Sequence, residues 1–413
     1  AVKTQESGTI LEVLLNEPLS PGQSTLLELT FEGQVPDVIR RAGKNSSEGV
    51  AFSMAQWYPK MAEYDVEGWN TDPYTGREFH GVWGNFDVKI KLDKDYTVAA
   101  SGYLQNADDI GKGYSDRKKA KAKKGLITWH FIAPEVHDFT WAADPNYTHD
   151  TRIAKNGTEL HFLYKNTDEF KQAWTEVQPY TEQALDYFNE NIGEYPYKQY
   201  SVIQAGDGGM EYAMCTFING GKTLRSIVGT VFHEFAHSWF QHVLATNESK
   251  HSWMDEGFTS YISGMASDKI LRGGDGKPSS RGYRGYYYLV ENNLSEPLTT
   301  HADRFNTNAA FGTGSYGKGS IFLSQLNYII GEENVKKTIK KYFEDFKFKH
   351  PTPNDIKRTA EKVSGLQLDW YLNEWIETNH TIDYAVTKVE GTNITLARVG
   401  KMPMPIDVTV TYN

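Results

Sequence analysis

Short runs of alternating apolar and polar residues fill the first part of the chain, up to about residue 165. Examples are GNFDVKIKL, YTVAASGYL and LITWHFIA, which are separated by turn residues. A period of two is typical of strands with one buried face. We therefore predict an all-β domain over residues 1–165. Near its start, the runs ILEVLL and STLLELTFEG flank the turn-like NEPLSPGQ, which predicts a hairpin.

The spacing of apolar residues becomes helical from about residue 166. The segment DEFKQAWTEVQPYTEQALDYFNENIG predicts a long amphipathic helix, and VKKTIKKYFEDF, PNDIKRTAEKVSG and WYLNEWIE predict later ones. A strand over residues 199–205 and a helix over residues 226–244 lie between them. From residue 379 the β pattern returns in DYAVTKVE, NITLARVG and IDVTVTYN. We predict a multidomain α+β protein with a mostly helical domain at 166–378 and the start of a β domain at 379–413.

Composition narrows the class of protein. A chain of 413 residues has room for two or three domains, and its net charge of −10 argues against a nucleic-acid partner. The single cysteine, Cys215, excludes an internal disulfide, and its apolar surroundings AMCTFI favour a small core residue. No apolar run approaches the roughly 18 residues of a membrane span, and no signal peptide is visible.

The most specific chemistry lies in HEFAH, residues 233–237. Residues four apart on a helix share one face, so His233 and His237 can bind one metal ion. Glu256, after eighteen intervening residues, would add a third ligand from a second helix. Three protein ligands leave one position open for water, as in catalytic zinc sites. Glu234 can reach that water as a general base without being a ligand.

The segment GGMEY, residues 208–212, follows the strand predicted at 199–205. Paired glycines in such a place indicate a bulge or the close approach of another backbone. An edge of this kind can hold an extended peptide by strand addition. Glu211 would then place a carboxylate near the end of the peptide.

A glycine-rich stretch, GTGSYGKGS, leads into a helix predicted at 321–330. Within it, Tyr316 could aim its hydroxyl into a cleft near the metal. A phosphate-binding Walker loop requires GxxxxGK[ST], and Gly319 after Lys318 breaks that pattern.

Together these three segments resemble the zinc aminopeptidase family of aminopeptidase N and leukotriene hydrolase, which are gluzincin metallopeptidases. The matching motifs are GGMEY (family GxMEN), HEFAH-x18-E (family HExxH-x18-E) and YGKGS (family YxKGx), in the family's order and at similar spacing. The resemblance covers about residues 10–413 and is diffuse outside the catalytic region. It implies a thermolysin-like catalytic domain, one Zn²⁺ per chain, and removal of N-terminal residues from peptides.

The resemblance also implies roles for individual residues. Tyr316 would stabilise the oxyanion, and Glu211 would pair with the free α-ammonium of the substrate. The substrate-binding segment would comprise Gly208, Gly209, Met210, Glu211 and Tyr212. Tyr212 stands where the family has Asn, which leaves open the shape of the first substrate pocket. Gln56, in FSMAQWYPKM, is the candidate for the N-terminal-domain residue that helps to hold the amine.

Family members carry more N-terminal β-structure and usually more C-terminal chain, so we expect a fragment or an unusually short member. An absent signal peptide then says nothing about the compartment, and we favour a soluble, exported or periplasmic protein over a cytoplasmic one. Three alternatives stay open: a zinc peptidase of the glycyl aminopeptidase type, a zinc hydrolase of a small epoxide lipid, and a catalytically silent binding protein on the same fold.

Overall fold

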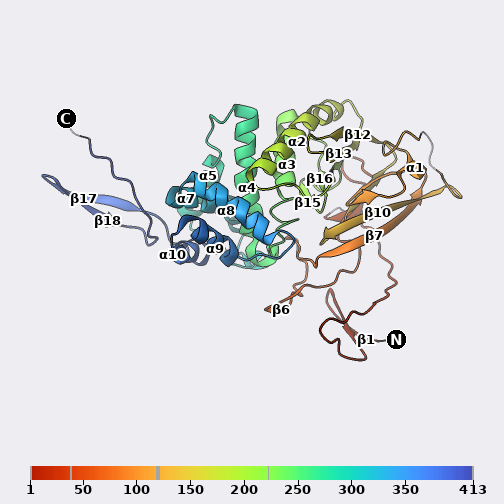
Figure 1. Cartoon of the computed structure of the whole chain (residues 1–413), viewed down its shortest axis with the longest axis horizontal. Helices are drawn as coiled ribbons and strands as arrows, with labels where there is room; N and C mark the ends of the chain where they lie inside the picture. The colour runs from red at the N-terminus through yellow and green to blue at the C-terminus, as the bar shows by residue number, and fades with distance from the viewer. Residues whose placement is uncertain (1, 38–39, 118–120, 222, 412–413) are drawn as a thin grey trace. The chain divides into compact units, whose positions relative to one another are not determined.

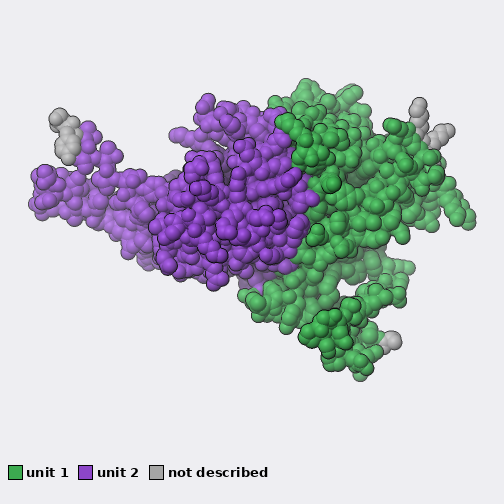
Figure 2. Space-filling view, viewed as in Figure 1, with its two compact units in different colours: residues 1–182, 197–235 green, residues 183–196, 236–413 purple. Residues whose placement is uncertain are grey.

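The computed structural model describes residues 2–37, 40–117, 121–221 and 223–411, and its α+β fold confirms the predicted class (Figure 1). The chain divides into two compact units, coloured green and purple in Figure 2. Unit 1 comprises residues 1–182 and 197–235, and unit 2 comprises residues 183–196 and 236–413. The domain boundaries expected near residues 165 and 378 stay predictions.

Unit 1 begins with small antiparallel sheets. A three-stranded sheet has the order β7 (Gly84–Asp93), β10 (Leu126–Val136), β9 (Tyr103–Leu104), and a four-stranded sheet has the order β3 (Ala42–Lys44), β4 (Phe52–Met54), β11 (Trp141–Asp144), β8 (Thr97–Ala100). Two-stranded pairs are β1 (Lys3–Ser7) with β2 (Ile10–Leu14) and β5 (Tyr64–Asp65) with β6 (Gly68–Trp69). Burial alternates along β7 and β10, as the sequence predicted. The four-residue helix α1 (Ala107–Ile110) interrupts this β region.

The predicted N-terminal hairpin is wrong in its partner strand. ILEVLL contains all of β2, but β2 pairs with β1 across a tight turn at Gly8, whose φ is +59°. Residues 24–33 form no strand, and Leu26 there is 81% exposed. Residues 405–411 are likewise irregular, while 412–413 lie outside the described residues. Alternation alone does not make a strand when no neighbour buries its apolar face.

A five-stranded mixed sheet completes unit 1. Its order is β12 (Tyr147–Ile153), β13 (Glu159–Lys165), β14 (Gln199–Gln204), β16 (Cys215–Ile218), β15 (Met210–Tyr212). Strands β13, β14 and β16 are parallel, and β15 is antiparallel to β16 at the sheet's edge. Every residue of β14 is buried, as expected where a parallel strand is covered on both faces. The predicted strand at 199–205 is therefore confirmed.

Two helices follow strands of this sheet in the chain. They are α2 (Lys171–Asn191), between β13 and β14, and α3 (Leu224–Ala236), after β16. The long amphipathic helix predicted from residue 168 is confirmed by α2. Cys215, at the start of β16, is buried, and burial raises the pKa of its thiol to about 12. This suits the predicted core role, because a thiol with so high a pKa is a poor nucleophile.

Unit 2 is mostly helical. Its elements are α4 (Glu248–Arg272), α5 (Ser280–Glu291), the 3₁₀ turn η1 (Ala302–Arg304), α6 (Asn308–Gly312), the π-helical turn η2 (Thr313–Lys318), α7 (Gly319–Ile330), α8 (Glu332–Phe346), α9 (Pro353–Ser364), α10 (Asp369–Glu377) and a hairpin of β17 (Tyr384–Glu390) and β18 (Asn393–Arg398). The later predicted helices are thus confirmed. The glycine-rich stretch that leads into the helix predicted at 321–330 is itself helical. Within the described parts of the chain, no helix has the length and apolar character needed to cross a membrane.

Candidate active site

The HEFAH segment lies at the C-terminal end of α3. Apolar residues along this helix, among them Val231, Phe232 and Phe235, are fully buried, so they fix which way its other face points. The helix ends at Ala236, earlier than the predicted residue 244. After Ala236 the chain continues in turns up to Val243, whose carbonyl accepts a hydrogen bond from the amide of Phe348 at 2.7 Å.

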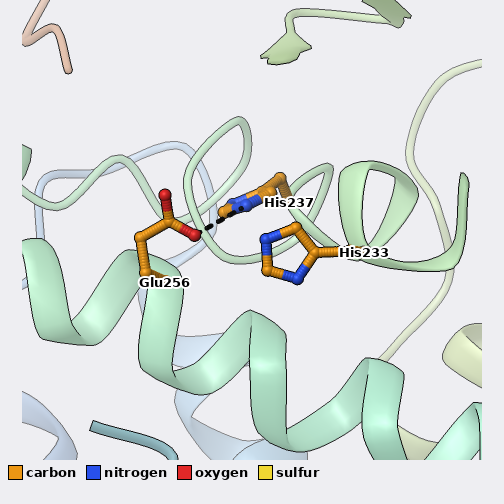
Figure 3. Close-up of side chains that lie close together, drawn as sticks. All are labelled: His233, His237 and Glu256. Carbon is orange, nitrogen blue, oxygen red and sulfur yellow. Dashed lines mark ion pairs between the residues drawn. The ribbon is translucent and has the colours of Figure 1, made fainter. Parts of the chain in front are cut away.

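His237, the first residue after α3, is held rigidly within unit 2. Its Nε2 lies 3.4 Å from Oε2 of Glu256, as the dashed line in Figure 3 marks. Its Nδ1 lies 2.6 Å from Oδ1 of Asp255 and 3.2 Å from the hydroxyl of Thr259. Asp255, Glu256 and Thr259 all belong to α4 and are buried. A carboxylate at Nδ1 keeps the proton there and leaves the Nε2 lone pair for a metal ion.

The predicted ligand residues come together. One ligand atom from each of His233, His237 and Glu256 lies within 4.8 Å of the others (Figure 3). Ligands at the usual zinc distances of about 2.0–2.2 Å in a tetrahedron are roughly 3.3–3.6 Å apart. The 3.4 Å between His237 and Glu256 matches that spacing. Two imidazoles and a carboxylate also form a typical catalytic zinc donor set, so these residues fit zinc.

Asp255 is a candidate site residue that the sequence reasoning missed, and its contact with His237 brings it into the site. It comes directly before Glu256 in WMDEGF, and Thr259 follows one helical turn later. The available signal was an acidic residue beside a ligand, four positions before a hydroxyl. That pattern is common on helices. Only the contact with His237 distinguishes this acidic residue from others of the same spacing.

The predicted close approach at GGMEY is present, but the neighbour is a side chain. Gly209 has φ +133°, and a Cβ placed on it would lie 2.9 Å from Oε1 of Glu234. Position 209 therefore favours glycine for its backbone conformation, and a larger residue there would have to displace the carboxylate of Glu234. This contact brings the segment that carries Glu211 directly against the predicted general base.

Strand β15 places neighbouring side chains on opposite faces. Met210 and Tyr212 belong to the apolar cluster that includes Ile203 and Phe217. Tyr212 is 1% exposed, and its ring packs edge-on against Phe217 at 5.0 Å between centroids. Side chains alternate along a strand, so Glu211 points away from that cluster. The aromatic residue at the family's Asn position is a core residue in this chain.

Tyr316 lies in η2, a single π-helical turn between α6 and α7. Such turns are rare and occur often at functional sites. Its side chain is 39% exposed, whereas the adjacent Ser315 is buried with its hydroxyl 2.8 Å from that of Ser252 on α4. A Cβ on Gly257 would meet the carbonyl carbon of Gly319 at 2.5 Å. The backbones of α4 and α7 therefore touch, which fixes Tyr316 relative to the helix that carries Glu256.

Lys318, the lysine of YGKGS, points into the protein. It is 1% exposed, and its Nζ donates to the carbonyl of Thr378 at 3.0 Å. Burial lowers the pKa of its ammonium to about 8. This lysine joins η2 to the end of α10 and has a structural role.

Gln56 is half-buried and has φ +53°. Its side-chain amide donates to the carboxylate of Asp138, which also accepts from the hydroxyl of Tyr58 at 3.0 Å. The amide nitrogen is therefore engaged within unit 1. A role for Gln56 in holding a substrate amine stays a prediction.

Comparison with known proteins agrees with this geometry. Residues 178–375, which include HEFAH and Glu256, match the peptidase family M1 domain. This part of the chain is an M1 peptidase domain. Among curated M1 relatives, it is 26% identical over 217 residues to aminopeptidase N of Streptomyces lividans, covering 48% of this chain and 25% of that protein. It is 28% identical over 227 residues to leucine aminopeptidase 2 of Emericella nidulans, covering 49% of this chain and 36% of that protein.

The M1 fold extends over most of the chain. The crystal structure of an M1 zinc metallopeptidase from Deinococcus radiodurans superposes with a TM-score of 0.65 at 16% identity, covering 92% of this chain and 82% of that one. A mutant of that peptidase bound to the substrate Tyr-Ser-Ala gives a TM-score of 0.62 at 17% identity, covering 91% and 81%. The matched part of this chain spans only a quarter to about a third of the two curated relatives described above.

Proposed function

We propose that this chain is a zinc aminopeptidase that removes N-terminal residues from peptides. The observation that carries the proposal is the group of His233, His237 and Glu256. It sits in an M1 domain whose curated relatives include aminopeptidase N. When bound there, zinc would act as a Lewis acid toward water and the scissile carbonyl.

Residues of the chain would carry out proton transfer, stabilise the oxyanion and position the substrate. Glu234, 6% exposed, would accept a proton from the attacking water and return it to the leaving amine. Tyr316 would donate its hydroxyl to the oxyanion. Asp255 and Thr259 would hold the imidazole of His237 in place through its Nδ1. The edge strand β15 would align an extended peptide, with Glu211 pairing with its terminal ammonium.

Free and N-acetylated forms of the same peptide test the exopeptidase assignment. We expect the free form to be cleaved at its first bond at least about 10-fold faster, because a charge-assisted contact to Glu211 is worth about 1.5–3 kcal/mol. Acetylation removes the charge and leaves a buried carboxylate facing an amide. The measurement is kcat/KM for each form by chromatography of the products. Equal rates, or cleavage at internal bonds, would identify an endopeptidase instead.

Asp255→Asn is expected to weaken zinc binding about 10–100-fold, which is typical when a partner of a metal-bound histidine is changed. The amide has nearly the same shape as the carboxylate, but it lacks the charge that makes the His237 imidazole a stronger donor. The measurement is the zinc dissociation constant from competition with a chromogenic chelator. An unchanged constant would mean that Asp255 only fills space beneath the ligand.

A further inference from the structure

A buried arginine lies beside the segment that carries Glu211. The side chain of Arg41 is 4% exposed, and all its partners belong to unit 1. Its guanidinium donates to the carboxylates of Glu78 at 2.8 Å and Asp207 at 3.2 Å, to the hydroxyl of Tyr74 at 3.2 Å and to the carbonyl of Arg77 at 3.0 Å, and it contacts the sulfur of Met210. Burying a charge is costly unless its hydrogen bonds are satisfied, and five contacts satisfy this one.

Three of these partners lie near Glu211 in the chain or in space. Met210 begins β15 and directly precedes Glu211, while Asp207 lies three residues before Met210. A carboxylate oxygen of Glu78 lies within 4.8 Å of one on Glu211. Arg41 therefore joins two segments more than 120 residues apart in sequence, both next to the proposed amine-binding carboxylate.

The carboxylates at this place favour a cation beside them. Carboxylate oxygens of Glu78 and Glu211 lie within 4.8 Å of each other, and Arg41 bonds to Glu78 and to Asp207. Burial alone lowers the pKa of Arg41, but the charge of Glu78, with smaller contributions from Tyr212 and Asp207, outweighs it and raises the pKa overall. Without the guanidinium, the carboxylates of Glu78 and Glu211 would repel each other at close range.

We propose that Arg41 is a positioning residue for recognition of the substrate's terminal ammonium. It anchors the start of β15 and neutralises the charge of Glu78 beside Glu211, so that Glu211 can receive a cation from the peptide. This inference rests on the proposed aminopeptidase function. It adds a residue from the N-terminal β region that does not itself touch the substrate.

Arg41→Met tests the inference, with Arg40→Met as a matched control. Arg40 is the neighbouring arginine and lies 3.8 Å from Asp207, but its side chain is 56% exposed. Both variants lose one positive charge near the same carboxylate. For a free aminoacyl-coumarin substrate, we expect Arg41→Met to lower kcat/KM about 10–100-fold, mainly through KM, since a charge-assisted hydrogen bond has that magnitude. Arg40→Met should stay within about twofold, as is usual for exposed ion pairs.

A second readout separates positioning from a general loss of structure. The preference for free over N-acetylated peptide should shrink in Arg41→Met, whereas zinc content should stay at the wild-type level. If that variant does not fold, Arg41→Lys replaces it, because lysine keeps the charge but lacks the planar fork. The same loss of preference is expected.

The outcomes distinguish failure of the proposed role of Arg41 from failure of the aminopeptidase assignment. A wild-type enzyme that prefers free peptides, with variants at Arg41 that keep this preference and the wild-type KM, would overturn the role of Arg41 alone. A fall in kcat and zinc content with an unchanged preference would also overturn it, since that is a structural effect. A wild-type enzyme with no preference would overturn the aminopeptidase assignment and the role of Arg41 with it.

Discussion

Glu234→Gln should abolish nearly all turnover while leaving zinc bound. Glutamine has the size and shape of glutamate, and Glu234 is not one of the three ligand residues, so the metal group is preserved. The amide cannot accept the proton that the proposed mechanism gives to Glu234. Loss of a general acid–base group typically costs about 10²–10⁴-fold in rate. The measurement is kcat on an aminoacyl-coumarin substrate together with zinc per chain by atomic absorption.

The packing around Glu234 should be preserved in this substitution. Glu234 is buried beside Gly209, and the hydroxyl of Tyr200 donates to its backbone carbonyl at 3.4 Å. Neither contact depends on the charge of the side chain. Glu333→Gln, at a side chain that is 79% exposed on α8, is the matched control and should leave kcat unchanged. Turnover near the wild-type rate in Glu234→Gln would assign the base to another group.

Tyr316→Phe has the second largest expected effect. It removes one hydroxyl from the π-helical turn η2, and an oxyanion donor is worth about 10²–10³-fold in kcat. The side chain is 39% exposed, so the free energy of unfolding should change little. Single-turnover rates compare the chemical step in the two proteins, and thermal unfolding compares their stability.

Tyr287→Phe provides the control for Tyr316, because it removes a hydroxyl from another exposed tyrosine, 56% exposed on α5. Its kcat should equal that of the wild type. If Tyr316→Phe also kept its rate, a different donor would have to stabilise the oxyanion. A rate loss accompanied by a large drop in stability would point to a packing role for the ring.

Local spacing is the part of the site that the sequence could predict. His233 and His237 share a helix face because of the helical period, and no distant part of the chain is needed for that inference. Glu256 was found because a ligand set has a limited range of spacings. Arg41 could not be found in this way, because its partner Asp207 is 166 residues away in the chain. Such contacts depend on how strands assemble and leave no local pattern.

The errors in the fold have a related cause. Residues 24–33 have the alternation of a strand, but a strand exists only where a neighbour completes its hydrogen bonds. The helix predicted to residue 244 ends at 236, and residues 243–245 instead bond to residues 348 and 349. The period of the apolar residues is the same on both sides of that end. In each case the period of the apolar residues is present in the sequence. The backbone conformation depends instead on contacts with distant parts of the chain.

The missing side chain at Gly209 limits how this protein can be altered. At this position the loop that precedes Glu211 meets the helix that carries Glu234, and an added Cβ would lie 2.9 Å from the carboxylate oxygen Oε1 of Glu234. A library that randomises residues 206–212 to change substrate preference would therefore displace the side chain of Glu234, the proposed general base, whenever it replaced this glycine. Redesign of peptide selectivity should hold position 209 fixed and vary the pocket from other segments.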